Sequence, residues 1–391
     1  SNMTESQIST THYYVKFTPA NETQFDTLMA NTDIEFYDHP LDYEIIGEGI
    51  RTNEQVSETL PNASYASWPI SKALPTDVPY EIIETLFIPD DDVNYGENQT
   101  VTNSAGNTYD YDFVENLVTK SLELTDNLEG EDETRASSWS PSGTIKAWDD
   151  LIEDYIPIAH VKVRTRRWFT TYSAYTNEQG YYSINKNYKR PANYAIVWES
   201  SKWDIRDGVV GQALYNGPKR TGGWNLNIKG GKSQAYATIT RACYLHFYDD
   251  NMGFPRTSAN RKIKIAYKHK DGDSLGEFRR GVFSGILYPH IKIFGKDGTE
   301  MIKTDDILKT TLHEFAHCAD YYRNHYHYRN SDDIIVEGWA ILAGWALTKQ
   351  EYVNRGYPNL LYSRNIARDE KGKLLIVEND HDYNYQYWCS E

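Results

Sequence analysis

His313-Glu314-Phe315-Ala316-His317 is the stretch of sequence that decides how this chain is interpreted. The surrounding residues 304–320 predict a helix, because apolar side chains recur there at a period near 3.6 and Thr304 suits the N-cap position. The apolar set consists of Ile307, Leu308, Leu312, Phe315, Ala316 and Ala319. Two histidines four residues apart lie one turn apart on the same helix face, so both imidazoles can reach one metal ion.

A second predicted helix supplies a third candidate ligand, Glu337. Ser331 suits the N-cap of this helix, two aspartates open it, and the residues that follow give it a broad apolar surface. These apolar residues are Ile334, Ile335, Trp339, Leu342, Ala343, Ala346 and Leu347. Glu337 falls within this surface, where an unpaired carboxylate is costly unless it is neutralised or bound to a cation.

The three side chains form a donor set that suits zinc. Zinc binds imidazole nitrogen and carboxylate oxygen well, and a catalytic zinc site keeps a fourth position open for water. We therefore expect one Zn²⁺ ion bound by His313, His317 and Glu337. Glu314, next to the first ligand, is expected to lean over the open position as a base and not to bind the metal.

Alternative interpretations of the same residues remain open at this point. The two histidines can be partly buried residues with ordinary partners, and Glu337 can be an ion-paired glutamate. A third histidine six residues after the second, as in metzincins, is excluded because that position is Arg323. His325 and His327 lie beyond the expected helix end, on a polar connection or along a cleft. Cys318 points about 100° away from the preceding histidine and is expected to be a small core residue.

The pattern of two histidines and a glutamate on the following helix resembles the gluzincin group of zinc metallopeptidases, to which thermolysin belongs. The run Glu337-Gly338-Trp339-Ala340 also resembles the second-helix signature of several gluzincin families. The resemblance implies hydrolysis of peptide bonds, with Glu314 as the catalytic base. It further implies that Tyr328 helps to hold the oxyanion, although Tyr321, Tyr322 and Tyr326 compete for that role.

The chain also departs from the thermolysin pattern. Thermolysin-like enzymes carry an aspartate four residues after the glutamate ligand, where it orients a zinc-bound histidine; here that position is Ile341. Such carboxylates fix the tautomer and the ring direction of the zinc-bound histidine. We therefore expect Asp320 or Asp333 to orient a zinc-bound histidine in this chain. The resemblance covers roughly residues 285–350. In the clan, a strand before the zinc helix forms the upper edge of the cleft and pairs with extended substrate, and residues 290–294 are the candidate.

Length and composition set the broader frame. A chain of 391 residues exceeds what one core usually serves, so we expect two or three domains. No run of eighteen apolar residues occurs, so no transmembrane helix is expected. Ser1-Asn2-Met3 resembles an expression remnant, and we expect an extracytoplasmic protein whose targeting signal was removed. The three cysteines can form one disulfide and one free thiol, or they can be three free thiols, and both options are open.

Charge divides the chain into three parts. Residues 1–150 carry 29 acidic and 6 basic side chains, residues 151–233 carry 6 acidic and 13 basic ones, and residues 234–391 carry 21 of each. This asymmetry suggests separate units, an acidic one and a basic one, that dock on each other. The competing view is that the acidic part is a solvated surface. The acidic balance of the whole chain argues against nucleic-acid binding by Arg164, Arg166, Arg167 and Trp168.

Local patterns complete the predicted fold. Residues 161–199 alternate like strands, and the stretch 176–182 resembles the strand–turn–strand of carboxypeptidase regulatory-like β-sandwich domains, with Gly180 at the turn. From about Lys232 a helix is expected, followed by strands at 262–267 and 290–294. The predicted fold is α+β and multidomain. It has an acidic N-terminal domain (1–150), a β-sandwich-like middle domain (151–233) and a zincin-like helical catalytic domain with an edge-strand sheet (234–391).

Two functional hypotheses follow. The first is zinc-dependent hydrolysis of peptide bonds in a protein or peptide substrate, with or without glycans, by a zinc-bound water that Glu314 activates. The second is a surface-associated binding protein whose zincin-like domain is not used for hydrolysis. Glu314 favours the first hypothesis, because a purely structural zinc site has no need of it.

Overall fold

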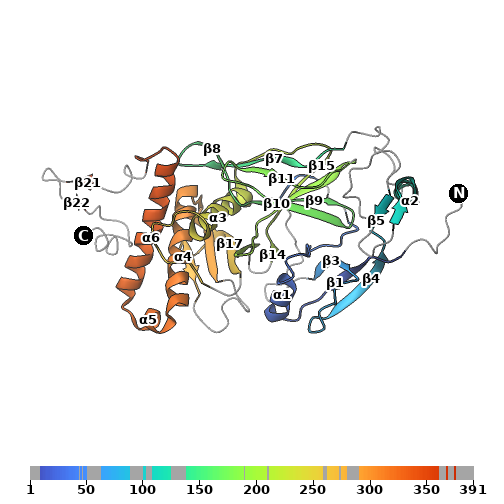
Figure 1. The fold of residues 1–391 in the computed structure, drawn as a ribbon. Coiled ribbons are helices and arrows are strands. Elements are labelled where there is room, and N and C mark those ends of the chain that lie inside the picture. Colours follow the sequence, from blue (N-terminus) through green and yellow to red (C-terminus); the bar gives the residue numbers. More distant parts are fainter. Residues whose placement is uncertain are drawn as a thin grey trace.

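The computed structural model describes residues 9–43, 45, 47–50, 63–88, 100–102, 108–124, 138–188, 190–208, 211–258, 262–272, 274–279, 290–360, 367–368 and 374–375. The fold is mixed α+β, as the sequence predicted. Several antiparallel sheets come first, and a helical region with a mixed sheet forms the C-terminal part (Figure 1).

The N-terminal part is built around a small antiparallel sheet of order β3-β1-β4. Its strands are β1 (His12–Phe17), β3 (Ser64–Pro69) and β4 (Tyr80–Leu86), and helix α1 (Glu22–Met29) follows β1. Asn21 caps α1 by accepting a hydrogen bond from the Gln24 N–H. A separate short hairpin of β5 (Thr100–Thr102) and β6 (Thr108–Asp110) precedes helix α2 (Tyr111–Leu124).

The middle part consists of two sheets that share one core. One sheet has the order β10-β9-β12-β15-β2 and is antiparallel throughout; the other has the order β11-β7-β16, with β8 on β7. The bounds are β2 (Gly49–Ile50), β7 (Ser142–Asp149), β8 (Asp154–Pro157), β9 (Lys162–Arg167), β10 (Thr170–Tyr175), β11 (Tyr181–Ser183), β12 (Ala192–Val197), β15 (Leu214–Arg220) and β16 (Leu226–Ile228). Buried side chains of both sheets, such as Ile145 and Val163, belong to one hydrophobic cluster. Gly180 has the expected positive φ, +71°, at the turn before β11.

The C-terminal part combines a six-stranded mixed sheet with four helices. The sheet has the order β14-β13-β17-β19-β18, with β20 on β19, and its neighbours β13, β17 and β19 run parallel. The strands are β13 (Trp203–Asp207), β14 (Gly211–Gln212), β17 (Ile263–Asp271), β18 (Gly276–Phe278), β19 (Ile291–Asp297) and β20 (Glu300–Met301). The helices are α3 (Gly231–Phe247), α4 (Thr304–Arg323), α5 (His325–Asn330) and α6 (Asp333–Asn354), and a short pair, β21 (Ala367–Arg368) and β22 (Leu374–Leu375), follows them.

The expectation that residues 290–294 form the edge of this sheet is wrong. These residues belong to β19, which is hydrogen-bonded to β17 on one side and to β18 on the other. In the described part of the sheet, β18 is the edge strand next to α4. This arrangement was not predictable from the sequence, because β18 begins with a glycine and has three residues. A strand of that length is too short to show a period-two pattern.

The hydrophobic core runs across the predicted division at residue 233. The largest cluster of buried side chains extends from Ile145 on β7 to Cys318 on α4, and β13 of the predicted middle domain pairs with β17 of the predicted C-terminal domain. The predicted boundaries at 150 and 233 stay predictions. Cys318 is a buried core residue, as expected, and both it and Cys243 are free thiols; Cys389 lies outside the described residues.

The expected docking of the acidic N-terminal part on the basic middle part is confirmed. The Glu35 carboxylate lies 2.9 Å from Lys162 Nζ and 3.0 Å from Arg164 Nε. Apolar contact accompanies the charges, since the rings of Tyr14 and Phe169 lie 5.1 Å apart. Arg164 is almost fully buried, so salt screens these pairs much less than exposed ones.

The N-terminal part also contacts the C-terminal sheet, which the charge distribution did not predict. Asp26 on α1 lies 2.8 Å from the buried Lys264 Nζ on β17. The Phe25 ring lies beneath the same ammonium group, 5.7 Å away, and beneath the Arg206 guanidinium, 5.4 Å away. Helix α1 therefore contacts two strands of the C-terminal sheet, β13 and β17.

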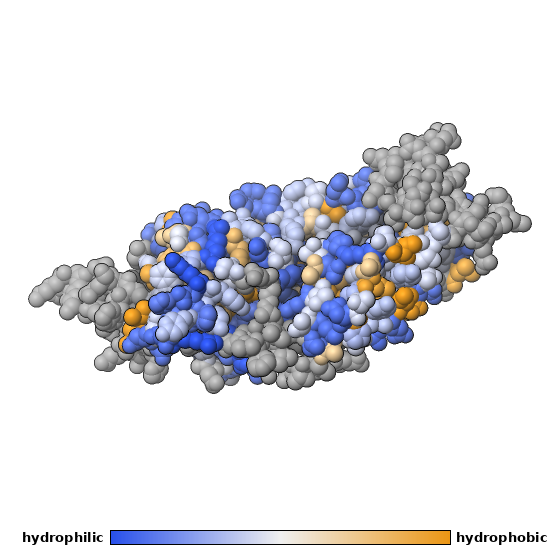
Figure 2. Space-filling view, turned by 60° about the horizontal axis from the view of Figure 1, so that its bottom comes forward, coloured by the Kyte–Doolittle hydropathy of each residue, from blue (hydrophilic) through white to orange (hydrophobic). Residues whose placement is uncertain are grey.

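On the face shown in Figure 2, the described surface is largely hydrophilic, and hydrophobic residues gather in patches. Among the described residues, no helix combines the length and the apolar character that crossing a membrane requires.

Both helices of the expected metal centre begin one residue away from the predicted caps. Thr304 is the first residue of α4 and not its N-cap; its N–H donates to Asp150 Oδ2 (3.1 Å), and its hydroxyl accepts from the Asp150 N–H (2.7 Å). The N-cap of α6 is Asp332 and not Ser331, with a side chain that accepts from the Ile334 N–H. The Asp150 carboxylate, in the turn after β7, thus binds the first N–H of α4, a contact that the local sequence of the helix cannot reveal.

A buried charge network joins three elements behind the metal helices. Arg241 on α3 donates to Glu351 on α6 and to Asp149 at the end of β7, both at 2.6 Å. The Tyr352 hydroxyl donates to the same Asp149 carboxylate at 2.8 Å. All four side chains are buried.

Removing this guanidinium should be strongly destabilising. We expect Arg241→Ala to lower the free energy of unfolding by about 3–5 kcal/mol, because Asp149 then stays buried without its cation and Glu351 keeps only Arg355. Lys120→Ala, which breaks an exposed pair with Glu123 on α2, should cost at most about 1 kcal/mol. Urea unfolding of both variants measures the difference. Equal losses would contradict the role given to Arg241.

Candidate metal centre

Close packing of α4 and α6 brings the three predicted ligands together. His313 and His317 lie one turn apart on α4, and Glu337 lies in the first turns of α6. Gly344 permits the approach of the two helices, because a Cβ at this position would lie 2.9 Å from the Lys309 carbonyl oxygen and 3.2 Å from His313 Cβ. A larger residue there would push α6 away from the histidines.

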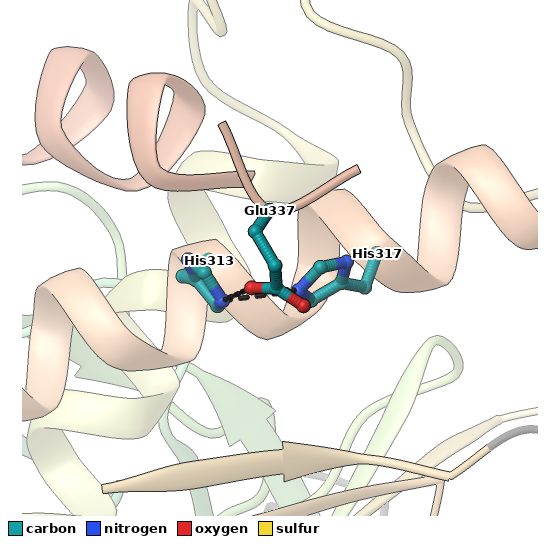
Figure 3. Close-up of side chains that lie close together, drawn as sticks. All are labelled: His313, His317 and Glu337. Atoms are coloured by element: carbon teal, nitrogen blue, oxygen red, sulfur yellow. Dashed lines mark hydrogen bonds and ion pairs between the residues drawn. The ribbon is translucent and has the colours of Figure 1, made fainter. Parts of the chain in front are cut away.

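The three ligand atoms are spaced as donors around a common ion. His313 Nε2 and His317 Nε2 are 3.0 Å apart, and Glu337 Oε2 lies 3.4 Å from the first and 3.3 Å from the second (Figure 3). Donors bound tetrahedrally to one zinc at about 2.0–2.2 Å would lie about 3.3–3.6 Å from one another. The residues therefore fit a metal ion, and they are the His/His/Glu group of the described residues that could hold one.

The triad is buried on one side and open on the other. The side chain of His317 is 6 % exposed, that of His313 20 % and that of Glu337 39 %. Burial alone would raise the pKa of Glu337, but the hydrogen bonds to His313 and His317 outweigh it and lower the pKa, so the carboxylate is ionised. An ionised carboxylate beside two imidazoles is ready to receive a cation.

Glu314 has the opposite electrostatic environment. Burial raises the pKa of this carboxyl group to about 7; the carboxylates of Glu337 and Glu277 add to the rise, while His313 and a backbone hydrogen bond from Phe278 oppose it. Its side chain is buried against the edge strand β18. A pKa near neutrality suits a group that accepts and returns a proton.

Sequence reasoning missed the contribution of β18. A Cβ at Gly276 would lie 2.6 Å from Glu314 Oε1 and 2.6 Å from Thr310 Cγ2, so only a glycine lets the strand approach α4 this closely. Two residues later, the Phe278 ring lies nearly parallel to the His317 ring, with 6.5 Å between centroids. The only signal in the sequence was a glycine two residues before an aromatic residue, which by itself predicts nothing.

Tyr328 lies beside the triad in a position that its predicted role did not anticipate. Its hydroxyl group lies 3.1 Å from His317 Nδ1, the ring nitrogen that faces away from the other ligands, and the residue is buried. Tyr328 therefore occupies this position beside His317, and the expected role of Asp320 or Asp333 stays a prediction. Its predicted contact with an oxyanion stays a prediction.

The remaining histidines of this region are not part of the triad. His325 and His327 are exposed residues of α5, and the group of described residues that could hold a metal contains neither. Both lie beyond the end of α4, as expected, in the short helix α5.

The high pKa of Glu314 predicts a pH dependence of stability in the metal-free protein. The folded-state pKa of about 7 exceeds the ordinary value of 4.5, so between these pH values the folded chain holds a proton that the unfolded chain has released. Unfolding then releases a proton, and this contribution to stability, complete below pH 4.5, is lost as the pH rises through about 7. Glu314→Gln cannot titrate here. Urea unfolding with a chelator at several pH values should show the parent losing stability relative to this variant; parallel curves would contradict the assignment.

Comparison with known proteins assigns the chain to no family. No protein-family model matches the chain, and no curated protein and no solved structure matches it either. The arrangement of His313, His317 and Glu337 is therefore the basis for any functional conclusion.

Proposed function

We propose that this protein is a zinc-dependent peptidase of the gluzincin type, which hydrolyses peptide bonds in proteins or peptides. The observation that carries the proposal is the spacing of the three ligand atoms, 3.0–3.4 Å, with the buried Glu314 carboxyl group one residue from the first ligand. A structural metal site needs four closed protein ligands, whereas three ligands leave a position for water.

The donor set favours zinc over harder or softer cations. Two imidazole nitrogens exclude a site built for Mg²⁺ or Ca²⁺, which prefer all-oxygen ligands, and the absence of thiolate from the triad argues against Cu(I). His₂Glu is a known ligand set of catalytic zinc in peptidases. Zinc, when bound, would make a water molecule more acidic and polarise the scissile carbonyl group.

Glu314 would act as the general base and then as the general acid. In the metal-free site, burial raises the pKa of this carboxyl group; in the loaded site the carboxylate would accept a proton from the attacking water and return it to the leaving amine. The edge strand β18 covers Glu314 on one side, which limits access of bulk water to the carboxyl group. The pKa of Glu337 is lowered and that of Glu314 is raised, so Glu337 suits metal binding and Glu314 suits proton transfer.

Strand β18 would bind the substrate backbone. In the described part of the sheet it pairs with β19 on one side only. On its other edge, beside the metal centre, the Phe278 N–H donates to Glu314 and the Gly276 carbonyl oxygen accepts from the Ser274 hydroxyl, so a bound peptide would exchange these hydrogen bonds for its own. An extended peptide can add to such an edge through main-chain hydrogen bonds. Strand β18 thus takes the role that was expected of residues 290–294, which belong to the inner strand β19.

Metal content and one substitution test the proposal. The purified protein should contain one zinc per chain and should cleave members of a random peptide library, and removal of zinc by a chelator should abolish cleavage. Glu314→Gln should keep the zinc and the fold but lose at least about 10²-fold in kcat, since the amide cannot accept the proton.

Glu300→Gln is the matched control, because it makes the same chemical change at an exposed glutamate of β20. It should retain both zinc and activity. A parent protein that binds zinc but cleaves nothing in the library would contradict peptidase function, and undiminished cleavage by Glu314→Gln would remove this residue as the base.

A further inference from the structure

We infer that Tyr328 positions the metal-binding histidine His317 and does not contact the oxyanion of the reaction. The inference rests on the proposed function, because it takes His317 to be a zinc ligand. It gives Tyr328 a role different from the one that resemblance to thermolysin implies. The argument depends on which nitrogen of His317 faces which partner.

The two ring nitrogens of His317 face different partners on opposite sides of the ring. Nε2 faces the triad, 3.0 Å from His313 Nε2 and 3.3 Å from Glu337 Oε2. Nδ1 lies 3.1 Å from the Tyr328 hydroxyl oxygen. When Nε2 binds a metal through its lone pair, the proton of the neutral ring is on Nδ1, and Nδ1–H donates to the tyrosine oxygen.

The burial of Tyr328 is inconsistent with a contact to substrate. The residue is 4 % exposed, and its hydroxyl group lies against the ring nitrogen that points away from the other ligands. An oxyanion donor must face the open position of the metal, where the scissile carbonyl binds. A hydroxyl on the far side of a ligand ring cannot do so without leaving its partner.

Several contacts hold the tyrosine ring in place. The rings of Tyr328 and His317 are perpendicular, with 6.1 Å between centroids, and Phe278 lies against both rings. The Tyr328 N–H donates to the Asn324 carbonyl oxygen (3.0 Å), and the Asn324 side chain caps the start of α5. The hydroxyl group therefore has one defined position relative to His317.

Tyr328→Phe tests the inference, because it removes the hydroxyl group and keeps the ring. Groups that hydrogen-bond to a metal-binding histidine contribute about 10–100-fold to metal affinity, so the zinc dissociation constant, measured by competition with a chromophoric chelator, should rise by about that factor. The visible absorption spectrum of the cobalt-substituted protein should change, because the ligand ring is no longer fixed. Thermal unfolding of the metal-free variant measures what the buried hydrogen bond itself contributes to folding, so that this contribution is separated from the loss of zinc affinity.

Tyr321→Phe is the matched control. Tyr321 belongs to the same aromatic group, 5.7 Å from Tyr328 between ring centroids, but its hydroxyl group accepts a hydrogen bond from Arg329. This variant should bind zinc with the affinity of the parent protein and give the parent cobalt spectrum. A loss of zinc affinity confined to Tyr328→Phe supports the positioning role.

Two other outcomes would overturn the inference. Unchanged zinc affinity and cobalt spectrum in Tyr328→Phe, together with a lower kcat, would return Tyr328 to the oxyanion role. Unchanged affinity, spectrum and kcat would leave it no role at the site. A parent protein that binds no zinc would instead refute the proposed function, and the inference with it, so the two failures are distinguishable.

Discussion

Two consecutive aspartates at the end of β7 and the turn after it hold the helices of the metal centre in place. Asp149 accepts from Arg241 and Tyr352, which ties α3 and α6 to the sheet, and Asp150 accepts from the first N–H of α4. Since α4 carries both histidines and α6 carries Glu337, the distance between ligands depends on these carboxylates. Buried ion pairs tolerate little displacement, because a separated pair leaves uncompensated charges in a medium of low dielectric constant.

The metal centre places two glutamates in environments that separate their chemistry. Glu337 is half exposed and adjoins two imidazoles, so its pKa falls and it is ionised. Glu314 is buried beneath β18 and lies near other carboxylates, so its pKa rises to about 7. The same functional group thus suits metal binding at one position and proton transfer at the other.

The acidic and basic residues that are segregated along the chain pair with each other in the fold and join its parts. Arg164 and Arg166, which stand out in the sequence as a basic cluster, are buried against the N-terminal part; the first pairs with Glu35, and the second donates to the Leu41 carbonyl oxygen. Lys264 is used in the same way by Asp26. The acidic N-terminal part is therefore joined to the rest of the chain by desolvated contacts and not by long-range attraction alone.

The sequence by itself determined the features that depend on short-range periodicity. Histidines four residues apart face the same side of any α-helix, so His313 and His317 were predictable as a pair. The apolar run around Glu337 indicated a partner for its carboxylate, although Ile334 and Ile335 of that run are exposed in the structure. The mixed α+β class and the turn at Gly180 were predictable on similar grounds, and the docking of oppositely charged parts was predictable from the distribution of charge along the chain.

Tertiary structure alone decided the features that depend on contacts between distant segments. Strand β18 has three residues, and its edge position depends on pairing with β19. The start of α4 depends on Asp150, which lies more than a hundred residues earlier. The contact of Tyr328 with His317 depends on how α5 folds back against α4. No local pattern encodes such contacts, because each of them forms only when the packing of the whole core brings the partners together.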